Sequence, residues 1–412
     1  MPFSLPQAGL RAATFTLIFA TGLAAQVPLP GKGSSHPRPG EGHEPREGRA
    51  EILPVFEFHS GFWVNLHHFL YQQARIREKL PVRRTDQGTT ATEMAPAAAL
   101  TPNEPAEAGA WSASLDYYAA TLAGRDLLFD GDLVAIKNIL AQSDSFPRSL
   151  GAQPSLEASG LPPKFVAALE QAAPIYRAHW WPEHDRTNRS WIAAVAPMVR
   201  QLGGTLAEQL AAIYQGEWPA GRIRVDLTIY AGRVGGYTSL DPLHVTISST
   251  EPRNQGSAAL EVLFHEASHG LAGAVREGIA RECRAHNKPI PRDLWHALLF
   301  YTTGEIVRRA LSVSDASSAS RMPSREATAG RALGVSDASS TSGTPSRDAP
   351  AGRRLGSAQS RVEGDYTPYA YRYGLYARGW QNYQRLLERY WQPYLDGKED
   401  FGSALAHLVA AL

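Results

Sequence analysis

Residues 265–269, His-Glu-Ala-Ser-His, carry the side chains of this chain that are best suited to chemistry. If the segment is helical, His265 and His269 lie on one face, so both imidazoles can bind the same metal ion. Glu266 then lies beside them, where its carboxylate can accept a proton from a water molecule on the metal. A helix with two hydrogen-bonded histidines and a surface glutamate is the alternative. The apolar neighbours expected of a buried active-site helix are present, namely Leu260, Val262, Leu263, Phe264 and Leu271.

A catalytic metal site of this kind needs a third protein ligand, and zinc is the default ion for such a ligand set. The extended motif with a third histidine six residues after His269 is excluded, because Ala272 and Val275 occupy its defining positions. The helix predicted from residue 292 carries two candidates, His296 and Glu305. They differ by about 180° around a helix and about 13 Å along it, so only one can face the metal.

The combination of His265–His269 with Gly304-Glu305 on a following helix resembles the gluzincin-type zinc metallopeptidases, over residues 222–310. The resemblance implies a zincin-like catalytic domain with His265, His269 and Glu305 as zinc ligands. It also implies Glu266 as general base for attack of a zinc-activated water on a peptide carbonyl. Gly304 stands where the family commonly has Asn, and Arg309 stands where the thermolysin-like subgroup has Asp, so the subfamily stays open.

Peptide hydrolysis also needs a hydrogen-bond donor for the oxyanion that develops on the carbonyl. The segment 366–376 contains five tyrosines. We take Tyr369 and Tyr373 as candidate donors, while most of these tyrosines are expected in the core or at the rim of the site.

The hydrophobic pattern predicts an α+β fold that is mostly α-helical, with a small β-sheet next to the metal-binding helix. Alternation predicts strands at 55–58, 223–230 and 243–248, with a glycine turn at 232–236. The strand at 243–248 either offers its edge to an extended peptide or is an ordinary internal strand. Helices are predicted at 62–77, 112–125, 131–142, 163–174, 190–201, 205–215 and from 292 onward.

Several other polar residues have two interpretations. The stretch 176–186 is rich in Trp, His and Arg, and it either lines a cleft or packs at the wet end of a helix bundle. His67 and His68 are adjacent and point about 100° apart on a helix, so we expect packing or cleft residues rather than metal ligands. Asn188-Arg189-Ser190 is a glycosylation sequon.

The two ends and one internal segment differ in composition from the rest. Residues 1–25 predict a signal peptide, because Arg11 precedes a short apolar run that ends in small residues. Residues 26–51 predict a disordered linker, which contains His36 and His43. A Ser/Ala-rich repeat with a period of 22 residues occupies 312–364 and predicts a disordered insertion. The catalytic domain therefore comprises 52–311 and 365–412.

Charge and cysteine content narrow the possible partners. The net charge of +1 gives no support for binding nucleic acid or anionic membranes. The single cysteine, Cys283, is expected to be a buried small hydrophobe. The resemblance and the signal peptide together imply a secreted or periplasmic zinc metallopeptidase that acts on peptides or proteins and has no stable membrane association after signal cleavage. The alternatives are a non-catalytic binding protein that retains the motif, and a zinc hydrolase of a non-peptide bond.

Overall fold

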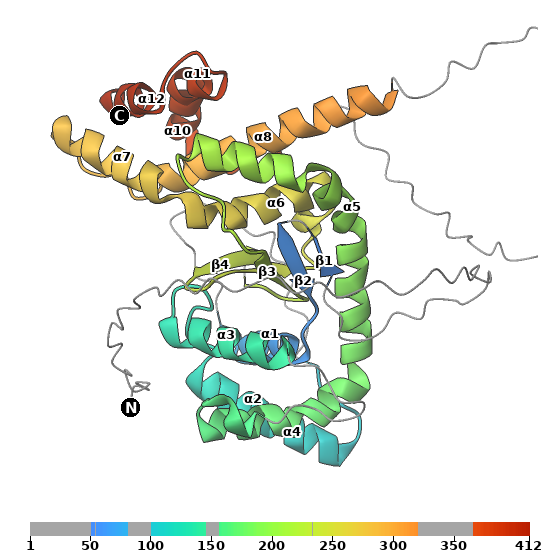
Figure 1. Cartoon of the computed structure of the whole chain (residues 1–412). Coiled ribbons are helices and arrows are strands. Elements are labelled where there is room, and N and C mark those ends of the chain that lie inside the picture. The colour runs from blue at the N-terminus through green and yellow to red at the C-terminus, as the bar shows by residue number, and fades with distance from the viewer. Residues whose placement is uncertain (1–50, 54, 81–99, 146–155, 233, 320–365) are drawn as a thin grey trace, which may run out of the picture. The chain divides into compact units, whose positions relative to one another are not determined.

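A five-stranded mixed β-sheet lies between two layers of helices (Figure 1). Its strands are β1 (Glu51–Ile52), β2 (Phe56–His59), β3 (Ile223–Thr228), β4 (Gly236–Leu240) and β5 (Leu243–Ser248). The order is β1-β2-β3-β5-β4, with β2, β3 and β5 parallel and the two outer strands antiparallel to their neighbours. Strand β4 is therefore an edge strand of the sheet.

This computed structural model describes residues 51–53, 55–80, 100–145, 156–232, 234–319 and 366–412, all in the unit Ala50–Leu412. The described chain is mostly helical. The longer helices are α1 (Phe62–Arg77), α2 (Pro105–Thr121), α3 (Gly131–Ser145), α4 (Pro163–His179), α5 (Trp181–Ile213), α6 (Ser257–Ser268), α7 (Gly273–Ala285) and α8 (Leu294–Ala319). Shorter helices follow: α9 (Tyr369–Arg372), α10 (Gln381–Leu386), a π-helical stretch (Leu387–Trp391), α11 (Gln392–Leu395) and α12 (Phe401–Ala410).

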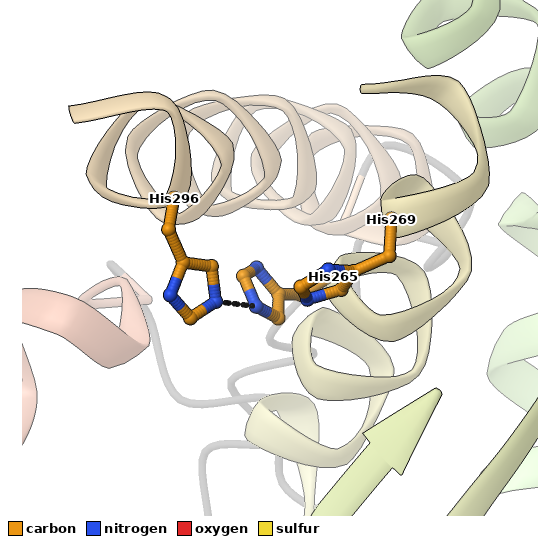
Figure 2. Close-up of side chains that lie close together, drawn as sticks. All are labelled: His265, His269 and His296. Carbon is orange, nitrogen blue, oxygen red and sulfur yellow. Dashed lines mark hydrogen bonds between the residues drawn. The ribbon is translucent and has the colours of Figure 1, made fainter. Parts of the chain in front are cut away.

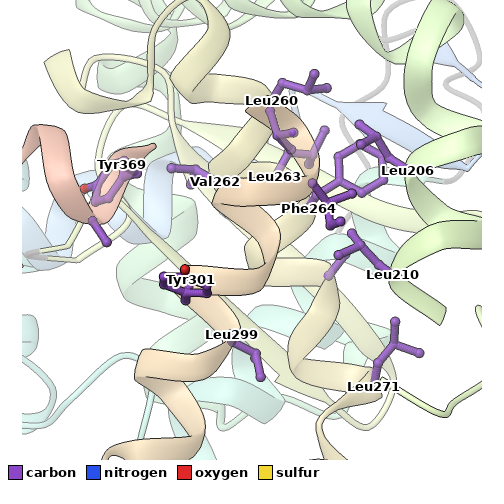
Figure 3. Packing of buried hydrophobic residues seen from close by; sticks show 14 of the residues in the cluster. Leu206, Leu210, Leu260, Val262, Leu263, Phe264, Leu271, Leu299, Tyr301 and Tyr369 are labelled. Atoms are coloured by element: carbon purple, nitrogen blue, oxygen red, sulfur yellow. The ribbon is translucent and has the colours of Figure 1, made fainter. Parts of the chain in front are cut away.

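Each face of the sheet is covered by its own set of helices. Helix α6 covers one face, with α8 beyond it, and α1 and α3 cover the other (Figure 1). The apolar face of α6 packs against α5, where Leu260, Leu263 and Phe264 meet Leu206 and Leu210 (Figure 3). A second apolar cluster fills the bundle of α1 to α4. Cys283 is buried in the first cluster, as expected.

The α+β prediction and most predicted elements are confirmed. The helices predicted at 190–201 and 205–215 are parts of the single helix α5. Strand β4 was not predicted, because its Gly-Tyr-Thr-Ser-Leu sequence follows a glycine turn and lacks apolar alternation. Strand β5 lies between β3 and β4, so of the two interpretations of 243–248 the internal strand is the right one.

Several expectations from the sequence lie wholly or mostly outside the described residues. They are the signal peptide at 1–25, the linker at 26–51 with its two histidines, and the insertion at 312–364. At the edges of these segments, Glu51 pairs in β1 and α8 continues past residue 312 to Ala319. None of the described helices has the length and apolar character to cross a membrane.

Candidate metal centre

Three imidazoles converge at the junction of α6 and α8. His265 comes from α6, His269 from the 3₁₀ turn His269–Leu271 that follows it, and His296 from the first turns of α8 (Figure 2). One ring nitrogen from each lies within 4.8 Å of the others. The Nε2 atoms of His265 and His296 are 3.2 Å apart. Two nitrogens that bind one tetrahedral zinc at 2.0–2.1 Å are separated by about 3.3 Å, so this spacing fits a metal ion.

Burial and stacking hold these rings in place. The His265 ring stacks on Phe300 with centroids 3.7 Å apart, and the His296 ring contacts both Phe300 and Trp380. Burial first, and then the neighbouring histidines, lower the pKa of His265 well below its usual value. Burial and then the positive charge of Arg276 lower the pKa of His269 to about 4. The imidazoles are therefore neutral at physiological pH, which is the form that binds a metal.

The structure brings His296, not Glu305, to the histidine pair. The Glu305 carboxylate accepts hydrogen bonds from Arg308 at 2.8 and 2.9 Å and from Arg309 at 2.7 Å. Burial by itself would raise the pKa of the Glu305 carboxyl, but these hydrogen bonds from the two arginines hold the pKa below its usual value. The expectation that Glu305 is the third ligand is thus corrected. Its position on α8, about half a turn round from His296, directs it to cations of its own helix instead.

Glu266 lies beside the histidines, as the motif predicts. Its Oε2 atom is 4.0 Å from His269 Nε2 and accepts a 2.7 Å hydrogen bond from the Thr238 hydroxyl. The same hydroxyl also lies 2.9 Å from the backbone oxygen of Glu266. The pKa of Glu266 is raised to about 7, because burial raises it by more than the hydrogen bond from Thr238 lowers it. Thr238 lies on β4, which explains why the sequence did not identify it.

The two candidate tyrosines have different positions. Tyr369 lines the cleft at the histidines and stacks on Phe300, with ring centroids 5.8 Å apart. Tyr373 packs against the Tyr369 ring at 4.6 Å and is not among the residues that line the cleft. Burial raises the pKa of the Tyr369 hydroxyl above its usual value, so it stays protonated and is able to donate a hydrogen bond.

A buried carboxylate ties the segment that carries Tyr369 to α6. Glu261 Oε2 accepts hydrogen bonds from the Tyr366 hydroxyl at 2.7 Å and from the Tyr369 backbone N–H at 2.9 Å. Burial raises the pKa of Glu261 to about 7, although both hydrogen bonds lower it. The residues after position 365 are thereby fixed against the helix that carries His265, so both parts of the chain contribute to one site.

A cleft of about 570 Å³ opens beside these residues. One wall comes from α6 and α8 with Tyr369 and Trp380, and the other from α1 and the loop that leads into α3. Strand β4 runs between the walls and contributes Gly236 to Leu240. Trp295, Trp380 and Arg253 also line the cleft, and sequence reasoning did not single them out for it, because they belong to no motif.

The other polar candidates lie elsewhere. His67 and His68 are buried and bind tyrosine hydroxyls, on Tyr118 and Tyr237 respectively. The stretch 176–186 packs in and around the α1–α4 bundle and does not line the cleft. Asn188 is fully buried and bonded to Asn65, Ser60 and Ser249, so the folded chain does not present the sequon for glycosylation.

Comparison with known proteins finds no matching family model, no similar curated protein and no similar solved structure.

Proposed function

We propose that this chain is an exported zinc-dependent metallopeptidase. The observation that carries the proposal is the convergence of His265, His269 and His296 beside the carboxylate of Glu266, in a cleft. The ligand set we propose is three histidines, in place of the two histidines and one glutamate of the gluzincin family. The proposal that the protein is exported rests on the signal-peptide pattern of residues 1–25, which predicts a secreted or periplasmic location.

Three neutral imidazoles are a ligand set that suits zinc in a catalytic site. When bound, zinc would act as a Lewis acid that polarises a carbonyl group and lowers the pKa of water. His265, His269 and His296 would hold it, each through one ring nitrogen. Their burial keeps them unprotonated, so no proton has to be displaced for the metal to bind.

Glu266 is suited to proton transfer. Its pKa of about 7 matches that of a group that accepts a proton from water and returns it to the leaving amine near neutral pH. Thr238 orients this carboxylate through its 2.7 Å hydrogen bond. We assign Tyr369 as the donor to the carbonyl oxygen, since it stays protonated and lines the cleft. Tyr373 then supports the Tyr369 ring rather than contacting substrate.

A peptide is the substrate that fits the walls of this cleft. Strand β4 pairs with β5 on one side and has no strand on its other side among the described residues. An extended peptide can add to such an edge through backbone hydrogen bonds. Because Gly236 to Leu240 line the cleft, a peptide paired there passes the three histidines.

The test is to measure metal content and peptide hydrolysis for the wild type, Glu266→Gln and a control, Glu208→Gln, on the exposed face of α5. We expect about one zinc per chain in all three proteins. Hydrolysis of a fluorogenic peptide library should be lost only in Glu266→Gln. Wild type without zinc would overturn the metal site. Full zinc occupancy without hydrolysis of any peptide would favour a non-catalytic protein or a hydrolase of another bond.

A further inference from the structure

Arg276 presents a positive charge at the metal end of the cleft. It lies on α7, is exposed, and lines the same cleft as the three histidines. Its guanidinium carbon is 4.8 Å from the centre of the Trp295 ring. That ring in turn contacts His269 edge to face, with ring centroids 5.6 Å apart. Arg276 is therefore one aromatic ring away from a proposed metal ligand.

The other arginines of the cleft have their guanidinium groups held by neighbouring oxygens. Arg75 is held by Ala123, Arg125 by Asp130 and Asp132, and Arg253 by Glu251. Arg276 differs, because its guanidinium has no hydrogen bond or ion pair with any residue that the structure describes. Its contact with Trp295 is a cation–π contact rather than a hydrogen bond. The N–H groups at the edge of the guanidinium stay available to a ligand.

A guanidinium arranged in this way suits a carboxylate. Its planar fork of N–H donors matches the two oxygens of a carboxylate and can form two parallel hydrogen bonds. The contact with Trp295 restricts the long side chain before a ligand arrives, which reduces the conformational entropy lost on binding. A neutral substrate group would gain much less from the same position.

We propose that Arg276 is a specificity-determining residue that binds a carboxylate of the substrate close to the metal. This inference rests on the proposed function and deepens it, since it selects peptides that carry an acidic group near the bond to be cut. The carboxylate is either the C-terminus of the peptide or an Asp or Glu side chain. Both sources share the same chemistry at Arg276.

Metal-binding probes test this without a need for catalysis. Dissociation constants are measured on zinc-loaded protein for acetohydroxamate and for hydroxamates that carry a terminal carboxylate or its amide on linkers of two to four carbons. We expect at least one carboxylate probe to bind about 10- to 100-fold more tightly than its amide in the wild type. This preference should vanish in Arg276→Gln, and Arg276→Lys should keep part of it. Arg281→Gln, on the same helix, should behave as wild type.

The outcomes separate this inference from the proposed function. If acetohydroxamate binds but no carboxylate probe is preferred over its amide, the role of Arg276 is wrong and the metal site stands. If no hydroxamate binds at all, both are wrong. Peptide pairs then identify the source of the carboxylate. A preference for a free over an amidated C-terminus in kcat/KM indicates the terminal carboxylate, and a preference for Glu over Gln indicates a side chain. If kcat/KM shows no preference in either comparison, the inference is overturned.

Discussion

The Nε2 atoms of His265 and His296 lie 3.2 Å apart, although the two residues are 31 positions apart in the chain. Neither ring can take up a proton easily at this spacing, because the environment is buried and a second positive charge would lie close by. A metal ion shared with His269 is the arrangement that uses all three nitrogens. This relationship replaces the one that the sequence favoured, in which Glu305 completed the site.

Replacing His296 by Ala should abolish tight metal binding, whereas Glu305→Gln should leave it unchanged. Loss of a residue that only supports a metal ligand already costs about 10- to 100-fold in affinity, so removal of a ligand should cost more than about 100-fold. Zinc or cobalt titration of the two variants beside the wild type measures the difference. Weakened metal binding in Glu305→Gln, with His296→Ala unaffected, would restore the glutamate as the third ligand.

Thr238→Val should move the acid limb of the activity profile to higher pH. The Thr238 hydroxyl lowers the pKa of Glu266, so its removal should raise that pKa above about 7. A shift of about one pH unit in kcat/KM is expected, since a hydrogen bond to a charged group is worth about 1.5–3 kcal/mol. Metal content should not change. Thr238→Ser keeps the hydroxyl and should retain the wild-type profile, so an equal shift in both variants would argue against this hydrogen bond as the cause.

Glu261→Gln should make the protein more stable above neutral pH. Folding raises the pKa of Glu261 from 4.5 to about 7, so the folded state binds the extra proton and stability falls as the pH rises through this window. By pH 8 the charged carboxylate costs up to about 3 kcal/mol, which the neutral glutamine avoids. Near pH 4 the two proteins should be equally stable. Urea unfolding at several pH values measures the free energy of unfolding. If the stability of Glu261→Gln decreases with pH as that of the wild type does, another group causes the decrease.

Asp226→Asn should destabilise the protein by about 1.5–3 kcal/mol at neutral pH, because it removes the charged partner of the half-buried Arg224. Asp226 is fully buried and bonds to Arg224 at 2.7 and 2.9 Å and to His244 at 2.5 Å. Burial alone would raise its pKa, but these two neighbours hold the pKa of Asp226 far below its usual value.

Since the folded pKa is depressed, the contribution of Asp226 is present above about pH 4 and is lost as the pH falls further. The gap in unfolding free energy between wild type and Asp226→Asn should therefore narrow in acid. The exposed Asp116, which pairs with Arg77 at the surface, provides the control, and Asp116→Asn should have almost no effect. A gap that stays constant down to pH 2 would contradict the ionised state of Asp226.

Patterns of short range made part of this structure predictable. The apolar spacing around Leu66, Phe69 and Leu70 predicted α1 with the bounds that it has. Alternation predicted β3 and β5, because their apolar side chains all lie on one face of the sheet, although most polar side chains of the other face are buried as well. Strand β4 was not predicted from the sequence, because it is an edge strand that is stabilised by pairing with β5. Its residues, among them Thr238 and Ser239, have no apolar alternation of their own.

The sequence by itself determined the pair His265 and His269 with Glu266, because the three are related by the pitch of a single helix. Tertiary structure decided the rest of the site. The choice between His296 and Glu305 depends on how α8 is rotated against α6, and that rotation is set by packing across the whole core. Likewise, Thr238, Tyr369 and Arg276 come together only because β4, α7 and the segment after position 365 all pack around α6.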